Sequence, residues 1–222
     1  GAQRRSMGTL VAVACLCLGG YVPSRMPAVD TLLVEESSLS FQKAFRITVT
    51  PSGSLFVCDE EMNKVYFFAN PGSEPRMVGG FGWGETTFDK PSGVATDGVN
   101  IYVADYGNHR IQRYDRALNF VSTLSTRDTS VERARFGFPL GVGLSRQGDL
   151  FVLDGENSRV VKFTNQSKFE RTFGDVESAY RLQKPLSLVV TEGDHVLVLE
   201  RDQIVEFDFS GNYVRSIGKG II

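Results

Sequence analysis

The strongest constraint on the fold is one sequence unit that occurs four times along the chain. Each copy has a glycine, a short apolar run and then an acidic residue. The four acidic residues are Asp59, Asp105, Asp154 and Glu200, and their spacings are 46, 49 and 46 residues. A repeat of this length is typical of folds built from one supersecondary unit stacked on the next. We therefore expect four copies of the same structural unit.

Each copy contains four stretches with the composition of short β-strands. In the second copy they are 91–96, 98–105, 111–114 and 120–124. No stretch shows the 3.6-residue apolar period of a helix, so helices should be few. Four short strands in each unit predict an all-β fold, a β-propeller with about four antiparallel four-stranded blades. Residues 31–40 are a candidate outer strand of the closing blade. The blades are expected at 41–79, 88–124, 136–174 and 183–218.

The second copy resembles a known family. Residues 88–115, FDKPSGVATDGVNIYVADYGNHRIQRYD, are similar to an NHL repeat over their whole length. The copy at 137–160 is similar but less complete, and those at 45–79 and 185–218 match more weakly. The resemblance implies an NHL-type propeller over residues 31–222. Because that family typically has six blades, it also implies that these four are part of a truncated six-bladed ring.

A basic residue stands five positions after the acid in the first three copies. An acid and a base at this spacing can close the turn between two strands with a charge-assisted hydrogen bond. We interpret these positions as structural, and they are Asp59 with Lys64, Asp105 with Arg110, and Asp154 with Arg159. The fourth copy has Glu200 but lacks the asparagine and the base.

Residues 1–30 have the pattern of an export segment. Arg4 and Arg5 precede the apolar or small residues 7–20, as in a secretory signal, and this run is too short to span a bilayer. The residues that end at Cys15 also resemble a lipobox, which would lipidate that cysteine. The alternatives are an ordinary cleaved signal or an apolar N-terminal strand of the fold. We expect an extracytoplasmic protein that contacts a membrane only through such a lipid anchor.

Charge and cysteine usage exclude several classes of site. The chain has 24 basic and 26 acidic residues with no basic block, so a nucleic-acid partner is not expected. Cys15 and Cys17 lie in the apolar N-terminal run, which leaves Cys58 alone in the body of the chain. This arrangement excludes a disulfide framework and a cysteine-based zinc site there. We expect Cys58 to be a small buried hydrophobic residue.

Function in a propeller usually lies on the face formed by the loops between blades and the turns between second and third strands. Trp83 is our first candidate for a ligand contact, because tryptophan, tyrosine and arginine dominate interface energetics. The alternative is that Phe81 and Trp83 cap the groove between two blades, and we favour it for Phe81. The candidate ligand-binding residues are Trp83, Tyr106, His109, Arg133, Arg135 and Tyr180.

The residues needed for catalysis are not found in the sequence. The chain has only His109 and His195, in different positions of the repeat, so we expect no metal site, no catalytic residue and no cofactor. Four residues suit a lactonase-type calcium site in kind, but they recur as repeat positions: Asp105, Asn108, Asp154 and Asn157. We predict a binding scaffold for a protein, peptide or glycan. The alternatives are a lyase- or lactonase-type enzyme with its catalytic residues in missing blades and, more weakly, a sensor domain of a larger receptor.

Overall fold

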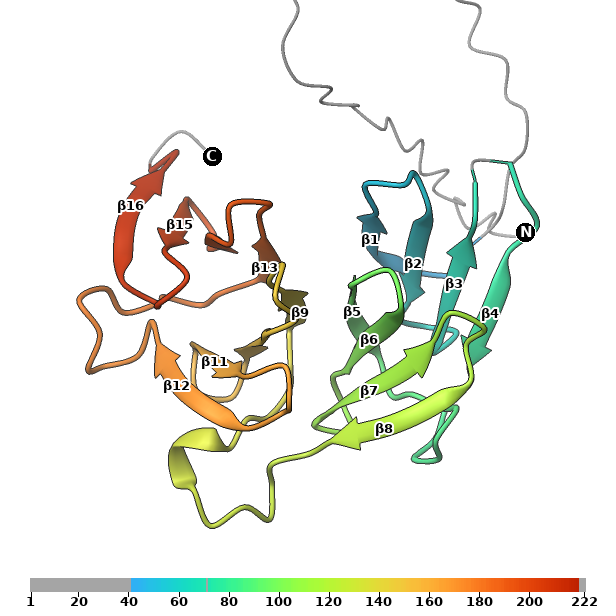
Figure 1. Cartoon of the computed structure of the whole chain (residues 1–222), viewed down its shortest axis with the longest axis horizontal. Coiled ribbons are helices and arrows are strands. Elements are labelled where there is room, and N and C mark those ends of the chain that lie inside the picture. Colours follow the sequence, from blue (N-terminus) through green and yellow to red (C-terminus); the bar gives the residue numbers. More distant parts are fainter. Residues whose placement is uncertain (1–40, 71, 220–222) are drawn as a thin grey trace, which may run out of the picture. The chain divides into compact units, whose positions relative to one another are not determined.

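The computed structural model describes residues 41–70 and 72–219 (Figure 1). The predicted export segment, residues 1–30, and the candidate outer strand, residues 31–40, lie outside the described residues. No helix in the described ranges is both long enough and apolar enough to cross a membrane.

The described residues form four antiparallel sheets of four strands each, and Figure 1 shows the sheets in chain order from blue to red. The first two sheets consist of β1 (Ala44–Val49), β2 (Leu55–Asp59), β3 (Lys64–Phe68), β4 (Arg76–Gly79), β5 (Pro91–Thr96), β6 (Asn100–Asp105), β7 (Arg110–Asp115) and β8 (Phe120–Leu124). The last two consist of β9 (Gly141–Leu144), β10 (Leu150–Asp154), β11 (Arg159–Phe163), β12 (Phe169–Phe173), β13 (Ser187–Val190), β14 (Val196–Leu199), β15 (Ile204–Phe207) and β16 (Tyr213–Ile217). One short 3-10 helix, η1 (Glu132–Ala134), lies between β8 and β9. The all-β fold with four-stranded antiparallel blades is therefore confirmed.

Glycines make the first turn of three blades possible. Gly53, Gly98 and Gly148 have φ values of 84°, 84° and 86°, a left-handed conformation that favours glycine. Each lies in the turn between the first and second strands of its sheet. In the fourth sheet Asp194 takes the left-handed conformation instead, with φ 59°. The glycine that marks each repeat in the sequence thus takes the left-handed turn position in three of the four blades, while Gly193 lies next to that position in the fourth.

The first strands of neighbouring sheets pack against one another, β1 on β5, β5 on β9 and β9 on β13. Small residues permit this approach. A Cβ at Gly93 would lie 3.1 Å from Cα of Gly141, and one at Gly143 would lie 2.6 Å from Cγ2 of Val190. Arg46 of β1 donates hydrogen bonds to backbone carbonyls of the second sheet and of the residue before β13. The four inner strands therefore form a common centre, as in a propeller.

The hydrophobic core lies between neighbouring sheets rather than within one. A fully buried residue on each blade-to-blade loop fills the groove: Phe88, Phe136 and Leu182. The expectation that Phe81 caps the first groove was wrong, since Phe81 is 71% exposed and Phe88, its β-bridge partner, occupies that place. Cys58 is buried, as predicted, in the apolar cluster that Phe88 fills between the first two sheets. Burial raises the pKa of its thiol to about 12.

Candidate ligand-binding face

The acidic residue of each repeat fixes the chain as it enters the first strand of the same blade. Its carboxylate accepts a hydrogen bond from a backbone N–H that lies 16 or 17 residues earlier. The donors are Gln42 and Lys43 for Asp59, Asp89 for Asp105, Gly137 for Asp154 and Gln183 for Glu200. Hydrogen bonds from backbone N–H groups to a carboxylate are charge-assisted and strong. The repeat acid therefore positions the end of every blade-to-blade loop.

The arginines of the second and third repeats connect this framework to two of the candidate ligand-binding residues. Arg110 Nε lies 2.8 Å from Asp105 Oδ2, and its Nη1 donates to the carbonyl oxygen of Trp83 at 2.8 Å. Arg159 Nε lies 3.1 Å from Asp154 Oδ2, and its Nη2 donates to the carbonyl oxygen of Arg135 at 2.8 Å. Trp83 and Arg135 are thus held by equivalent arginines through their main chains.

The first repeat differs from this pattern. No ion pair joins Lys64 to Asp59 within the part of the chain that the structure describes, so the predicted pairing is absent there. Both oxygens of Asp59 already accept backbone N–H groups, those of Gln42, Lys43, Glu61 and Met62, at 2.8 to 3.1 Å. A carboxylate satisfied in this way needs no cation to close its turn.

The loop that carries Trp83 is fixed along most of its length by one face of β7. Arg110 also donates to Gly84 O at 2.9 Å, and Gln112 Nε2 donates to the same oxygen at 3.1 Å. Tyr114, two residues further along β7, donates from its hydroxyl to Glu85 O at 2.8 Å. These alternate residues of a strand point to one side of the sheet. The loop backbone is therefore well positioned, while Trp83 itself is 71% exposed.

His109 joins the second and third blades. Its Nδ1 accepts a hydrogen bond from the backbone N–H of Phe138 at 3.0 Å and lies 2.7 Å from Nη2 of Arg127. Burial and the charge of Arg127 lower the pKa of His109. Because Nδ1 accepts the Phe138 N–H, the proton of the neutral ring lies on Nε2. The rings of His109 and Tyr106 pack on Phe138, with centroid distances of 4.1 and 5.2 Å. Both candidates thus belong to an interblade aromatic cluster.

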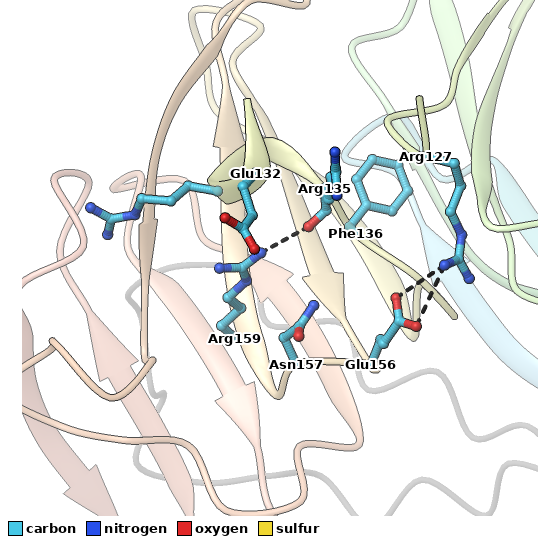
Figure 2. Close-up of a pocket in the computed structure, with 8 residues that line it drawn as sticks. Arg127, Glu132, Arg135, Phe136, Glu156, Asn157 and Arg159 are labelled. Atoms are coloured by element: carbon cyan, nitrogen blue, oxygen red, sulfur yellow. Dashed lines mark hydrogen bonds and ion pairs between the residues drawn. The ribbon is translucent and has the colours of Figure 1, made fainter. Parts of the chain in front are cut away.

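A hollow of about 480 Å³ lies between η1 and the turn from β10 to β11 (Figure 2). Its lining residues are Arg127, Glu132, Arg133, Arg135, Phe136, Glu156, Asn157 and Arg159. Arg127 lies 3.5 Å from Glu156, and both side chains are about two-fifths exposed. Figure 2 shows the two interactions already described for this region, those of Arg127 with Glu156 and of Arg159 with the Arg135 carbonyl.

The two arginines predicted at this place have different surroundings. Arg133 donates to Thr172 Oγ1 at 2.9 Å and pairs with Glu177 at 3.3 Å, so it connects η1 to the third blade. Arg135 uses Nε for the carbonyl oxygen of Thr129, at 3.0 Å. Among the described residues no carboxylate lies within ion-pair distance of Arg135.

The fourth repeat replaces the missing asparagine and base with other side chains. Gln203 Nε2 donates to Glu200 Oε2 at 2.8 Å, and the hydroxyl of Tyr180 donates to the same oxygen at 2.9 Å. Gln203 follows its acid by three residues, as Asn108 and Asn157 follow theirs. Burial and the Glu200 contact raise the pKa of Tyr180 to about 12. The equivalence of Gln203 was missed in the sequence, although the spacing of three residues signals it.

No group of three or more histidine, cysteine, aspartate or glutamate residues that could hold a metal ion occurs within residues 41–70 and 72–219.

Comparison with protein families identifies the repeat. The family model described as NHL repeat matches residues 88–114 and 136–163, the two copies with complete acid, asparagine and arginine sets. This chain is an NHL-repeat β-propeller. The prediction that its four blades belong to a six-bladed ring stays a prediction.

Two curated proteins are similar to this NHL propeller. Protein brain tumor from Drosophila melanogaster is 32% identical over 145 residues, which is 63% of this chain and 13% of that protein. The B-box type zinc finger protein ncl-1 from Caenorhabditis elegans is 32% identical over 141 residues, 62% of this chain and 16% of that protein. The NHL propeller therefore spans less than a fifth of the length of these curated relatives.

Solved structures share the fold at low sequence identity. A virginiamycin B lyase from Staphylococcus aureus has a TM-score of 0.55 at 14% identity, over 76% of this chain and 53% of that chain. A chain of a nidogen/laminin complex has a TM-score of 0.56 at 15% identity, over 76% of this chain and 60% of that one. At such identity the likeness concerns the propeller fold alone.

The NHL propeller separates the six candidate residues into two groups. Trp83 and Arg135 are held by their main chains and leave their side chains exposed. The other four, Tyr106, His109, Arg133 and Tyr180, make contacts between blades or within a repeat. Phe138 and Glu156 were not predicted for this face, because no repeat position marks them.

Proposed function

We propose that this NHL propeller binds a protein or peptide ligand through one face. This loop face consists of the blade-to-blade loops 80–90 and 125–140 and the turns 106–109 and 155–158. The observation that supports the proposal is the equivalent main-chain support of Trp83 and Arg135. A side chain on a fixed backbone loses less conformational entropy when it binds than one on a mobile loop.

The charge of the loop face supports a peptide rather than a neutral glycan. Exposed guanidinium groups of Arg127 and Arg135 accompany the aromatic side chain of Trp83 on this face. Guanidinium groups bind carboxylates in a two-pronged geometry, and peptides supply carboxylates where neutral sugars do not. Tryptophan and arginine are also the side chains that most often dominate protein interfaces.

A selection from a displayed peptide library tests the proposal. We expect peptides that bind the wild-type chain and bind Trp83→Ala at least about tenfold more weakly, since an interface tryptophan commonly contributes more than 1.4 kcal/mol. The matched control is Val99→Ala. Val99 is 60% exposed, and its turn between β5 and β6 lies at the opposite end of the sheet. If no peptide is enriched, or if both variants bind the enriched peptides equally, the proposal fails.

We further propose that the protein is exported. The support is the pair Arg4 and Arg5 followed by the apolar run of residues 7–20. Expression of the full chain, fractionation of the cells and N-terminal sequencing of the product test this. Recovery from the extracytoplasmic fraction without the segment is the expected result, and recovery of the intact segment in the cytosol contradicts it.

A further inference from the structure

We propose that the hollow beside η1 binds one acidic side chain of the peptide ligand, with Arg135 as its anchor. The inference rests on the proposed function and adds the chemistry of the site. The ligand class is an extended peptide segment with an aspartate or glutamate that enters the hollow.

The four arginines of the hollow are not equally free to bind an anion. Arg159 is paired with the buried carboxylate of Asp154, and Arg133 is paired with Glu177. Arg127 has a longer contact, 3.5 Å, with Glu156. The Nη atoms of Arg135 make no hydrogen bond within the described ranges. The Nη edge of the Arg135 guanidinium is therefore available to bind a carboxylate, which matches a pair of parallel N–H groups.

The backbone around Arg135 is held on both sides. Its carbonyl oxygen accepts from Arg159, and its N–H donates to Glu132 O at 3.1 Å. The next residue, Phe136, is fully buried, and its N–H donates to Thr126 Oγ1 at 2.9 Å. Because Nε of Arg135 is also bonded, to Thr129 O, the guanidinium plane is oriented before a ligand arrives. Such preorganisation strengthens binding by lowering its entropic cost.

The carboxylates of the hollow favour a single acidic side chain over a nucleic-acid strand. Glu132 and Glu156 both line the hollow, with a volume of about 480 Å³. The other three arginines of the hollow already contact carboxylates, so, among the described residues, a strand of phosphates would meet one unpaired guanidinium and the charges of these two groups. A peptide brings one carboxylate to Arg135. Its backbone N–H groups can then donate to Glu132, Glu156 or the side-chain oxygen of Asn157.

The test uses a double-mutant cycle on the peptides enriched by the selection. In the strongest binder, each Asp or Glu is replaced in turn by Asn or Gln, and affinities are measured by fluorescence polarisation. We expect one replacement to weaken binding to the wild-type chain by about tenfold or more, the effect of a charged hydrogen bond. The same replacement should have less than about a twofold effect on Arg135→Gln. Arg146→Gln, a charge-matched control on the turn between β9 and β10, should behave as wild type.

Each other outcome overturns a specific claim. If peptides bind without an acidic residue and bind Arg135→Gln as tightly as wild type, the inference fails while the proposed function stands. If no peptide is enriched, both fail. If a labelled 12-nucleotide single-stranded RNA binds more tightly than every peptide and depends on Arg135, the carboxylate assignment is wrong. If Arg135→Gln does not fold, Arg135→Lys takes its place beside the peptide replacements measured on the wild-type chain. The absence of an effect on binding in either measurement overturns the inference.

Discussion

Replacement of Arg110 by methionine should destabilise the propeller far more than replacement of Lys64, the residue at the same repeat position. Arg110 is paired with Asp105, and the two side chains are 12% and 0% exposed. Removal of one partner from a buried pair costs about 3–5 kcal/mol. Asp105 keeps its donors Asp89 N–H and Asn108 Nδ2, each at 2.8 Å, so we expect the lower end, about 3 kcal/mol.

The thermal midpoint converts this loss into a measured quantity. For a protein of this size 1 kcal/mol shifts the midpoint by about 2–4 °C, so Arg110→Met should unfold about 6–12 °C below wild type. Lys64→Met should stay within about 0.5 kcal/mol, because no ion pair joins Lys64 to Asp59 in the described residues. Circular dichroism at 218 nm follows the melt. Equal midpoints for the two variants would refute the reasoning.

The same variant should also release Trp83, the one tryptophan in the sequence. Arg110 is hydrogen bonded to the carbonyl oxygens of Trp83 and Gly84, so its loss should lower the fluorescence anisotropy of the folded chain. Burial raises the pKa of Asp105 above its ordinary value, and loss of Arg110 raises it further. A carboxyl group whose pKa is raised by folding stabilises the fold at low pH, and this contribution is lost as pH rises through the raised pKa. The difference from wild type should thus be larger at pH 7 than at pH 4.5.

Three further perturbations have defined outcomes. Because burial raises its thiol pKa to about 12, Cys58 should resist iodoacetamide in the native chain and react in urea, as measured by peptide mass spectrometry. Because folding lowers the pKa of His109, its contribution to stability is complete above pH 6.5 and is lost as pH falls through the lowered pKa. Urea midpoints measured between pH 5 and 7.5 should show this loss in the wild-type chain and not in His109→Asn. Gly79→Ala should lower the free energy of unfolding by about 3 kcal/mol or more, since φ is 130° and the new Cβ would overlap the carbonyl oxygen of Asn63; a urea midpoint equal to wild type would contradict this.

The blades could be predicted from the sequence because their signals are local. Alternating apolar runs, punctuated by glycines, define strands and turns without knowledge of distant contacts. The same holds for the pairs Asp105–Arg110 and Asp154–Arg159, since five residues span one turn between adjacent strands. Such features need only the hairpin to form.

The failures concern features that depend on distant residues. Phe81 and Phe88 lie on one loop, and only the fold decides which of them enters the groove between blades. Lys64 follows the repeat pattern, but the backbone N–H groups near Gln42 already satisfy its acid. The sequence does not distinguish Arg133 from Arg135, which lie two residues apart. Their roles differ because Glu177, in another loop, forms an ion pair with Arg133.

The division of residues into structural and ligand-binding ones is too coarse for this propeller. Arg110 and Arg159 stabilise the repeat, and they also position Trp83 and Arg135. The two repeat arginines donate hydrogen bonds to the main-chain carbonyl oxygens of those residues, and every amino acid has such an oxygen. Their side chains can therefore change without loss of the repeat arginine's contact. A blade of this kind separates the requirement for folding, which acts on the main chain, from the requirement for recognition, which acts on exposed side chains.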